Sequence, residues 1–279
     1  MIPGARNLDI EQRILDAVDR MPAFPRSVER IISLTRHIDC EPKAIVEVLE
    51  TDPIMAARVL RTINSAFYAL PRPISSMAHA VVMLGINTIK NLALAISAMG
   101  MMPARNPAGF DTAAYLKHSL SVAGVARLVA YRLGDADPSE TYIAGLLHDF
   151  GKILFAVYLP REFSAALDLS EDENLPLYLA EREIMGIDHA HAGALMVEKW
   201  KLPQELGECI AAHHDAEIGT GMLRCLFIAD QLVKRQNPES FIAELPPGLA
   251  PSLGDSWEAI SNALPEQERI LDEISALSR

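Results

Sequence analysis

The chain has 279 residues, of which 50% are hydrophobic and 22% are charged, with a formal net charge of −12. This length allows one large domain or two smaller ones with a substantial core. An acidic chain has no general attraction for nucleic acid or for an anionic membrane surface, so we expect neither as a partner.

The spacing of the cysteines, the N-terminal residues and the length of the apolar runs indicate where in the cell the protein is expected. Cys40, Cys209 and Cys225 are too widely spaced for a disulfide framework or a CxxC zinc knuckle. Residues 1–18 carry charges throughout and lack the apolar core of a signal peptide. The longest apolar runs are too short or too interrupted to span a bilayer. We therefore expect a cytoplasmic protein.

Apolar residues recur at helical spacing from the N-terminus onward, and alternating strand patterns are scarce. Pro42 and Pro53 fit first helical positions, and Asp52 fits the N-cap before Pro53. The stretch 87–101 is so apolar that we expect a helix buried on most sides. We predict an all-α fold, a multi-helix bundle. Its first helices are expected at residues 8–20, 28–35, 42–49, 54–63, 76–84 and 87–101.

Residues 103–111 form the expected internal boundary, because two prolines, a glycine and an asparagine interrupt the helical pattern there. We expect an N-terminal helical subdomain at 1–102 and a second, histidine-rich helical subdomain at 112–235. The segment 236–279 combines a proline-rich stretch with two short helices. It is expected either to wrap the domain or to form an oligomer contact such as a homodimer. The helices expected in the second half cover residues 112–133, 139–148, 152–158, 161–170, 175–185, 189–200, 203–213 and 222–235.

Several imidazoles and carboxylates of the second half lie in apolar helical contexts, where an unpaired polar group is costly to bury. The pair His148-Asp149 ends one such helix, and a break follows at Gly151. If these side chains converge, they form a site for one or two divalent ions, and imidazole with carboxylate suits Fe, Mn, Ni or Zn more than Ca or Mg. The candidate ligands are His118, His148, Asp149, His189, His213, His214 and Asp230.

Each candidate also has a purely structural interpretation. His118 could be a hydrogen-bonded core histidine. The pairs His148-Asp149 and His213-His214 could be exposed helix ends, and Asp230 could be an ion-pair partner. His189 and His191 are two residues apart on a helix and cannot face the same way, so we expect at most one of them to be a ligand.

These residues resemble the H…HD…D signature of the HD superfamily of metal-dependent phosphohydrolases, and the added histidines resemble the HD-GYP subgroup. The N-terminal half resembles the HDOD domain, the HD-related output domain of bacterial signalling, and the likeness covers about residues 15–235. The HDOD-like positions are Phe24-Pro25, Asp52-Pro53, Met55, Leu60-Arg61, Asn64-Ser65-Ala66, Ile74, Ala80-Val81 and Leu84-Gly85.

The resemblance implies an HD-superfamily helical bundle that acts in signal transduction, with a signalling protein or a small nucleotide as partner. It also implies two metal positions that share Asp149, with iron or manganese expected before nickel or zinc. One position would use His118, His148, Asp149 and Asp230. The other would use His189, His213 and His214 with Asp149.

The sequence departs from HD-GYP proteins in ways that argue against cyclic-di-GMP hydrolysis. Ala114 stands where some of them have a glutamate, and no GYP signature follows His213-His214. If metals bind, a metal-bound water would be the nucleophile for a phosphoester, with Asp149 orienting it and Lys152 contacting the phosphate. Two functions therefore remain open: a signalling output module with a retained metal site, or an active metallophosphohydrolase on a nucleotide-type phosphoester.

Overall fold

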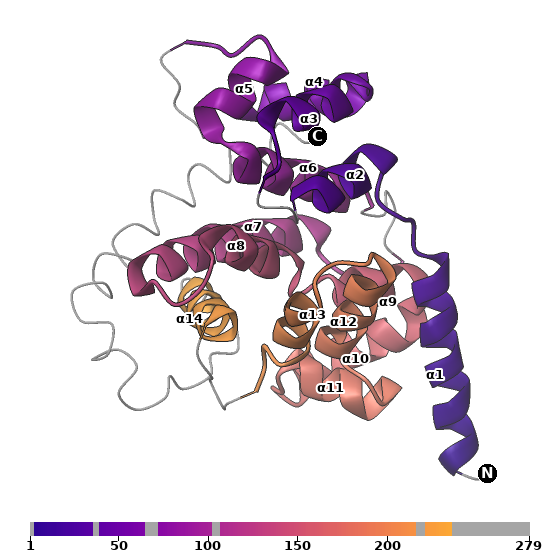
Figure 1. Cartoon of the computed structure of the whole chain (residues 1–279). Coiled ribbons are helices and arrows are strands. Elements are labelled where there is room, and N and C mark those ends of the chain that lie inside the picture. The colour runs from indigo at the N-terminus through magenta and orange to yellow at the C-terminus, as the bar shows by residue number, and fades with distance from the viewer. Residues whose placement is uncertain (1–2, 36–38, 65–71, 102–106, 216–220, 236–279) are drawn as a thin grey trace. The chain divides into compact units, whose positions relative to one another are not determined.

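The computed structural model describes residues 3–35, 39–64, 72–101, 107–215 and 221–235. Every regular element in these residues is an α-helix, which confirms the all-α prediction (Figure 1). The helices divide into two compact units. One unit contains α2 to α6, and the other contains α1 together with α7 to α14.

In the first unit, polar residues at the HDOD-like positions hold helix ends and loops in place. Asp52 is the N-cap of α4, where it accepts a hydrogen bond from the Met55 backbone at 3.0 Å. It also accepts one from the Ser27 hydroxyl of α2 at 2.6 Å. The Asn64 amide clamps the backbone of Ile74 through two bonds of 2.7 Å each. The helices are α2 (Arg26–Thr35), α3 (Pro42–Glu50), α4 (Pro53–Ile63), α5 (Met77–Leu84) and α6 (Ile86–Gly100).

Helix α6 is the core of this unit, as its apolar sequence predicts. Its residues from Leu92 to Ala98 are all buried, and it packs against α2, α4 and α5. Gly85 separates α5 from α6 with a φ of +79°, a conformation that glycine adopts at little cost. No single helix of the described ranges is long and apolar enough to cross a membrane. Only taken together are α5 and α6 long and apolar enough for such a span, and the two helices are bent by 116° at the break between them.

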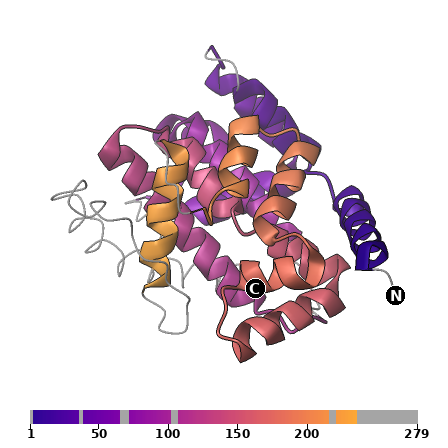
Figure 2. The same ribbon diagram turned by 90° about the horizontal axis from the view of Figure 1, so that it is seen from below.

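In the second unit α7 packs along α8 and α14, while α12 packs against α9 and α13 (Figures 1 and 2). Asp111 and Asp137 cap α7 and α8 by accepting backbone hydrogen bonds. The helices are α7 (Thr112–Leu133), α8 (Pro138–Leu147), α9 (Gly151–Tyr158), α10 (Pro160–Asp172), α11 (Leu177–Met185), α12 (His189–Lys199), α13 (Gln204–Ala211) and α14 (Met222–Lys234).

Helix α1 (Pro3–Arg20) belongs to the second unit, which differs from the expected grouping of residues 1–102. Its C-terminal end is held by Lys199, whose ammonium donates to the carbonyls of Val18 and Asp19. The Trp200 indole N–H donates to the Pro22 carbonyl at 3.1 Å. Sequence periodicity shows that a helix has an apolar face, but it does not show which partner covers that face.

Several expectations fall outside the described residues. They concern Ser65-Ala66 of the HDOD-like positions, residues 103–106 of the internal boundary, the segment 216–220 after the histidine pair, and the segment 236–279.

Candidate metal centre

The centre is built around the junction between α8 and α9. Helix α8 ends at Leu147, and a turn over residues 148–150 leads directly into α9. This turn places His148 and Asp149 in the interior, where their side chains are 0% and 2% exposed. The predicted break is therefore this turn, and Gly151 is the first residue of α9 rather than a helix breaker.

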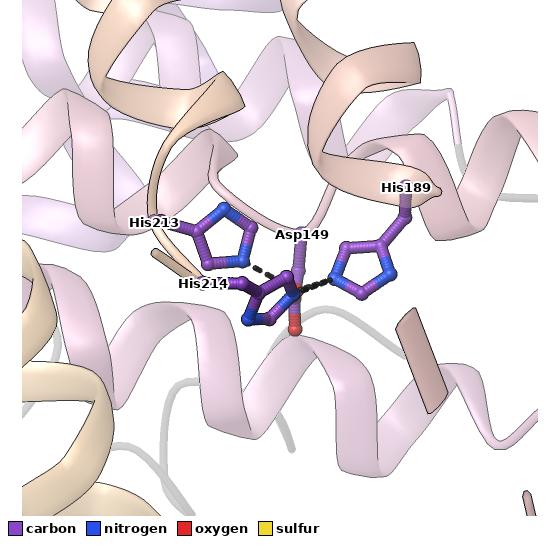
Figure 3. A group of neighbouring side chains, drawn as sticks. All are labelled: Asp149, His189, His213 and His214. Carbon is purple, nitrogen blue, oxygen red and sulfur yellow. Dashed lines mark hydrogen bonds and ion pairs between the residues drawn. The ribbon is translucent and has the colours of Figure 1, made fainter. Parts of the chain in front are cut away.

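All seven predicted ligand candidates converge, in two groups. Within each group, one nitrogen or oxygen of every residue lies within 4.8 Å of the others. The first group, which we call the His189 group, is drawn in Figure 3. The second, which we call the His118 group, draws its residues from α7, the α8–α9 turn and α14. The His189 group is Asp149, His189, His213 and His214, and the His118 group is His118, His148 and Asp230.

The Asp149 carboxylate faces both groups. Its Oδ1 lies 3.0 Å from His189 Nε2 and 3.7 Å from His213 Nε2. Its Oδ2 lies 3.6 Å from His118 Nε2 and 3.4 Å from His148 Nε2. One carboxylate with an oxygen toward each group is the arrangement that a ligand shared by two metal ions requires.

Three buried histidines are oriented through Nδ1. His148 and His213 place Nδ1 2.8 Å and 2.7 Å from the carbonyl oxygens of Gly145 and Ile210. His189 places Nδ1 2.6 Å from a Glu181 carboxyl oxygen. A carbonyl oxygen can only accept a hydrogen bond, so Nδ1 is the nitrogen that carries the proton whenever the ring of His148 or His213 is neutral. Their Nε2 lone pairs then point into the centre, as in metal-bound histidines with an outer hydrogen-bond partner.

The protonation states suit metal binding. Burial lowers the pKa of His213 to about 4 and lowers the pKa of His214 well below its usual value, so both rings are neutral near pH 7. Burial acts to raise the pKa of Asp149, but His148 and Lys152 hold that pKa well below its usual range. Burial likewise acts to lower the pKa of His189, yet Glu181 and Asp149 raise it overall, so at this ring a metal ion must displace a proton. Neutral imidazoles and ionised carboxylates are the forms that bind metal.

The centre contains buried polar atoms that the surrounding protein leaves without a hydrogen bond, and one of them belongs to His213. His213 Nε2 is enclosed and makes no hydrogen bond within the described part of the chain. A buried polar atom without a partner costs about 1–3 kcal/mol. A metal ion at this point would satisfy that nitrogen, so the donors present fit a divalent ion that accepts imidazole and carboxylate ligands.

The structure also shows residues that the sequence did not single out. Lys234 contacts Asp230 Oδ2 at 2.6 Å, and its spacing of four residues on α14 could have indicated it. Glu181 is fully buried within α11, but Arg182 and Glu183 follow it directly, so its sequence context does not indicate a buried position. Tyr178 stacks on His214 with the ring centroids 4.3 Å apart. Lys152, which the sequence did predict near the site, contacts Asp149 Oδ2 at 2.6 Å.

His191 lies away from the centre. Its side chain is 53% exposed and its Nδ1 lies 2.8 Å from Asp188 Oδ1. Of the pair on α12, only His189 therefore faces the metal candidates, which agrees with the expectation that at most one could. His79 is an exposed residue of α5 and lies in the other unit.

A helical bundle that gathers its His and Asp side chains around an HD pair has the HD-type fold. Within that class, the HDOD domain model matches residues 21–216, and the chain belongs to the HDOD family. A protein of Treponema pallidum (strain Nichols) with no assigned role is 24% identical over 219 residues, which are 75% of this chain and 42% of that protein. The chain thus spans about two fifths of the length of this curated relative.

Solved structures share the fold. A protein from Shewanella amazonensis SB2B, provisionally named a phosphohydrolase, is 24% identical with a TM-score of 0.75, over 94% of this chain and 97% of that one. A protein from Marinobacter aquaeolei VT8, provisionally named a signal transduction protein, is 23% identical with a TM-score of 0.77, over 98% of this chain and 65% of that one.

Proposed function

We propose that this protein is a bacterial signal-transduction output module of the HDOD type whose second unit holds one or two divalent transition-metal ions. The observation that carries the proposal is the Asp149 carboxylate, which directs one oxygen to each group of ligand candidates. Iron and manganese suit mixed imidazole and carboxylate ligands, and we expect them before nickel or zinc. The names of the structural relatives point in the same direction.

The ligand of such a module would be a phosphate-bearing small molecule of the nucleotide type. When bound, the metal ions would neutralise phosphate oxygens and acidify a water molecule. Lys152 and Lys234 place two ammonium groups at the carboxylates of Asp149 and Asp230. Their side chains are 16% and 20% exposed, so both can contact a ligand that enters from solvent. Each would add a point charge that attracts phosphate.

A second candidate function is metal-dependent hydrolysis of a nucleotide-type phosphoester. This function is favoured because all seven ligand candidates meet inside the second unit, in two neighbouring groups. In that case Asp149 would orient the attacking water and Lys152 would hold a phosphoryl oxygen. A relative with the fold, at 16% identity and a TM-score of 0.58, is also provisionally named a metal-dependent phosphohydrolase.

One experiment separates the two candidates. Protein loaded with Mn²⁺ or Fe²⁺ is assayed against a panel of mono-, di- and cyclic nucleotides for both binding and release of product. Binding without turnover supports the output module, and turnover that is lost in Asp149→Ala supports the hydrolase. Absence of metal from the wild type and from Asp149→Ala alike contradicts both candidates.

A further inference from the structure

Glu181 is a buried carboxyl group that the proposed centre has not yet explained. Its side chain is 0% exposed and lies in the middle of α11. The neighbouring Arg182 pairs with Asp188 at 2.6 Å instead. Glu181 Oε2 accepts a hydrogen bond from the His189 backbone N–H at 2.8 Å and lies 2.6 Å from His189 Nδ1. A group that is costly to bury is thus committed to one histidine, at both its backbone and its ring.

This contact distinguishes His189 from the other oriented histidines. His148 and His213 have backbone carbonyls opposite Nδ1, whereas His189 has a carboxyl group. A hydrogen bond to an ionised acceptor is roughly twice as strong as a neutral one. A carboxylate behind a metal-bound histidine also fixes the ring and makes its Nε2 a more basic ligand. The contact between Glu181 and His189 Nδ1 therefore favours metal binding at the His189 group.

Lys152 and Lys234 oppose metal binding beside His118 and His148. Lys152 contacts Oδ2 of Asp149, which is the oxygen that faces His118 and His148. Lys234 contacts Oδ2 of Asp230, which belongs to the His118 group. An ammonium beside a ligand carboxylate competes with a divalent ion for that carboxylate and repels the ion. The carboxylate oxygens next to the two ammonium groups are thus Oδ2 of Asp149, which faces His118 and His148, and Oδ2 of Asp230 in the His118 group. The His189 group has Glu181 behind its histidine instead.

We propose that Glu181 is a positioning residue that makes the His189 group the tighter of two metal positions, so that this position fills first. The inference rests on the proposed metal centre and adds to it an order of filling. It follows that a second ion enters the His118 group more weakly, beside the two lysines, where a phosphate anion would balance the added charge.

The test is a Mn²⁺ titration of the metal-free full chain, with free Mn²⁺ measured by electron paramagnetic resonance. For the wild type we expect two binding steps. Glu181→Gln retains the size and an acceptor oxygen, and we expect it to weaken the tighter step about 10- to 100-fold, the usual effect of losing an outer-shell partner. The weaker step should stay unchanged. A mere packing defect would instead weaken both steps.

Two matched variants make the assignment of each step independent of Glu181. His118→Ala should remove the weaker step and leave the tighter one. Lys234→Met should tighten the weaker step several-fold, because it removes an ammonium from Asp230. If Glu181→Gln leaves the tighter step unchanged, or His118→Ala removes it, the inference is overturned while the centre stands. If the wild type binds no Mn²⁺, the proposed function fails and this inference fails with it.

Discussion

The junction that brings the two halves of the centre together depends on a glycine. Gly151, the first residue of α9, lies against the backbone of His189, the first residue of α12. A Cβ atom added at Gly151 would lie 2.1 Å from the His189 carbonyl oxygen and 2.8 Å from its Cα. Both neighbours are backbone atoms, so neither can rotate away. Gly151→Ala must therefore move α9 and α12 apart.

The size of this displacement sets the expected effect. A carbon and a carbonyl oxygen approach to about 3.3 Å, so the two backbones must separate by roughly 1 Å. Overpacking of this kind costs about 1–3 kcal/mol. Metal–ligand distances tolerate only about 0.2 Å, so moving His189 relative to Asp149 should also lower metal affinity. Thermal unfolding and metal content, measured on the same preparation, check both effects.

Gly207→Ala is the matched control, because Gly207 lies within α13 and an added Cβ would make only ordinary van der Waals contacts, at 3.4 Å with Val197 Cγ1 and at 3.8–3.9 Å with Val197 Cβ and the Ala194 carbonyl oxygen. We expect this variant to have wild-type metal content and equal or higher stability, by up to about 1 kcal/mol from the better helix propensity of alanine. Wild-type stability together with wild-type metal content in Gly151→Ala would refute the close approach of α9 and α12.

Three further predictions concern other contacts. Lys152→Ala should retain its metal, bound at least as tightly because an ammonium leaves Asp149, but weaken inorganic phosphate binding to the metal-loaded protein, measured by calorimetry; loss of metal would contradict this role. Asp52→Ala should destabilise the protein by about 1 kcal/mol through loss of the α4 cap. The Ser27 and Met55 hydrogen bonds lower the Asp52 pKa below 3.8, so this difference should be present above pH 3.8 and shrink as the pH falls further, in thermal melts of both proteins. Trp200→Phe keeps a ring but loses the bond to Pro22, and should cost about 1 kcal/mol with faster proteolysis of α1; unchanged cleavage would count against that docking.

Much of the fold could be predicted from local signals. The proline starts of α3 and α4, the Asp52 cap and the apolar length of α6 are properties of short segments, and the structure contains each of them. The docking of α1 could not be predicted, because it depends on Lys199 and Trp200, which are distant in sequence.

The candidate site was predictable to a similar extent. The seven polar residues stand out because each interrupts an apolar helical context, and the structure brings them together. Their arrangement around Asp149 could not be predicted from the sequence. Which carboxylate oxygen faces which histidine, and where Lys234 and Glu181 enter, depends on the packing of α11, α12 and α14. Gly151 illustrates the limit, since it resembles a helix breaker in sequence but serves as a contact point in the fold.

The metal content of the protein as isolated is the most direct test of the proposed metal centre. Elemental analysis of the wild type, beside Asp149→Ala purified in the same way, measures it without any assumption about a substrate. Because Asp149 directs an oxygen to each group, we expect about one to two transition-metal ions per chain in the wild type and a large loss in the variant. Equal, near-zero metal in both proteins, unchanged after incubation with Mn²⁺ or Fe²⁺, would contradict it.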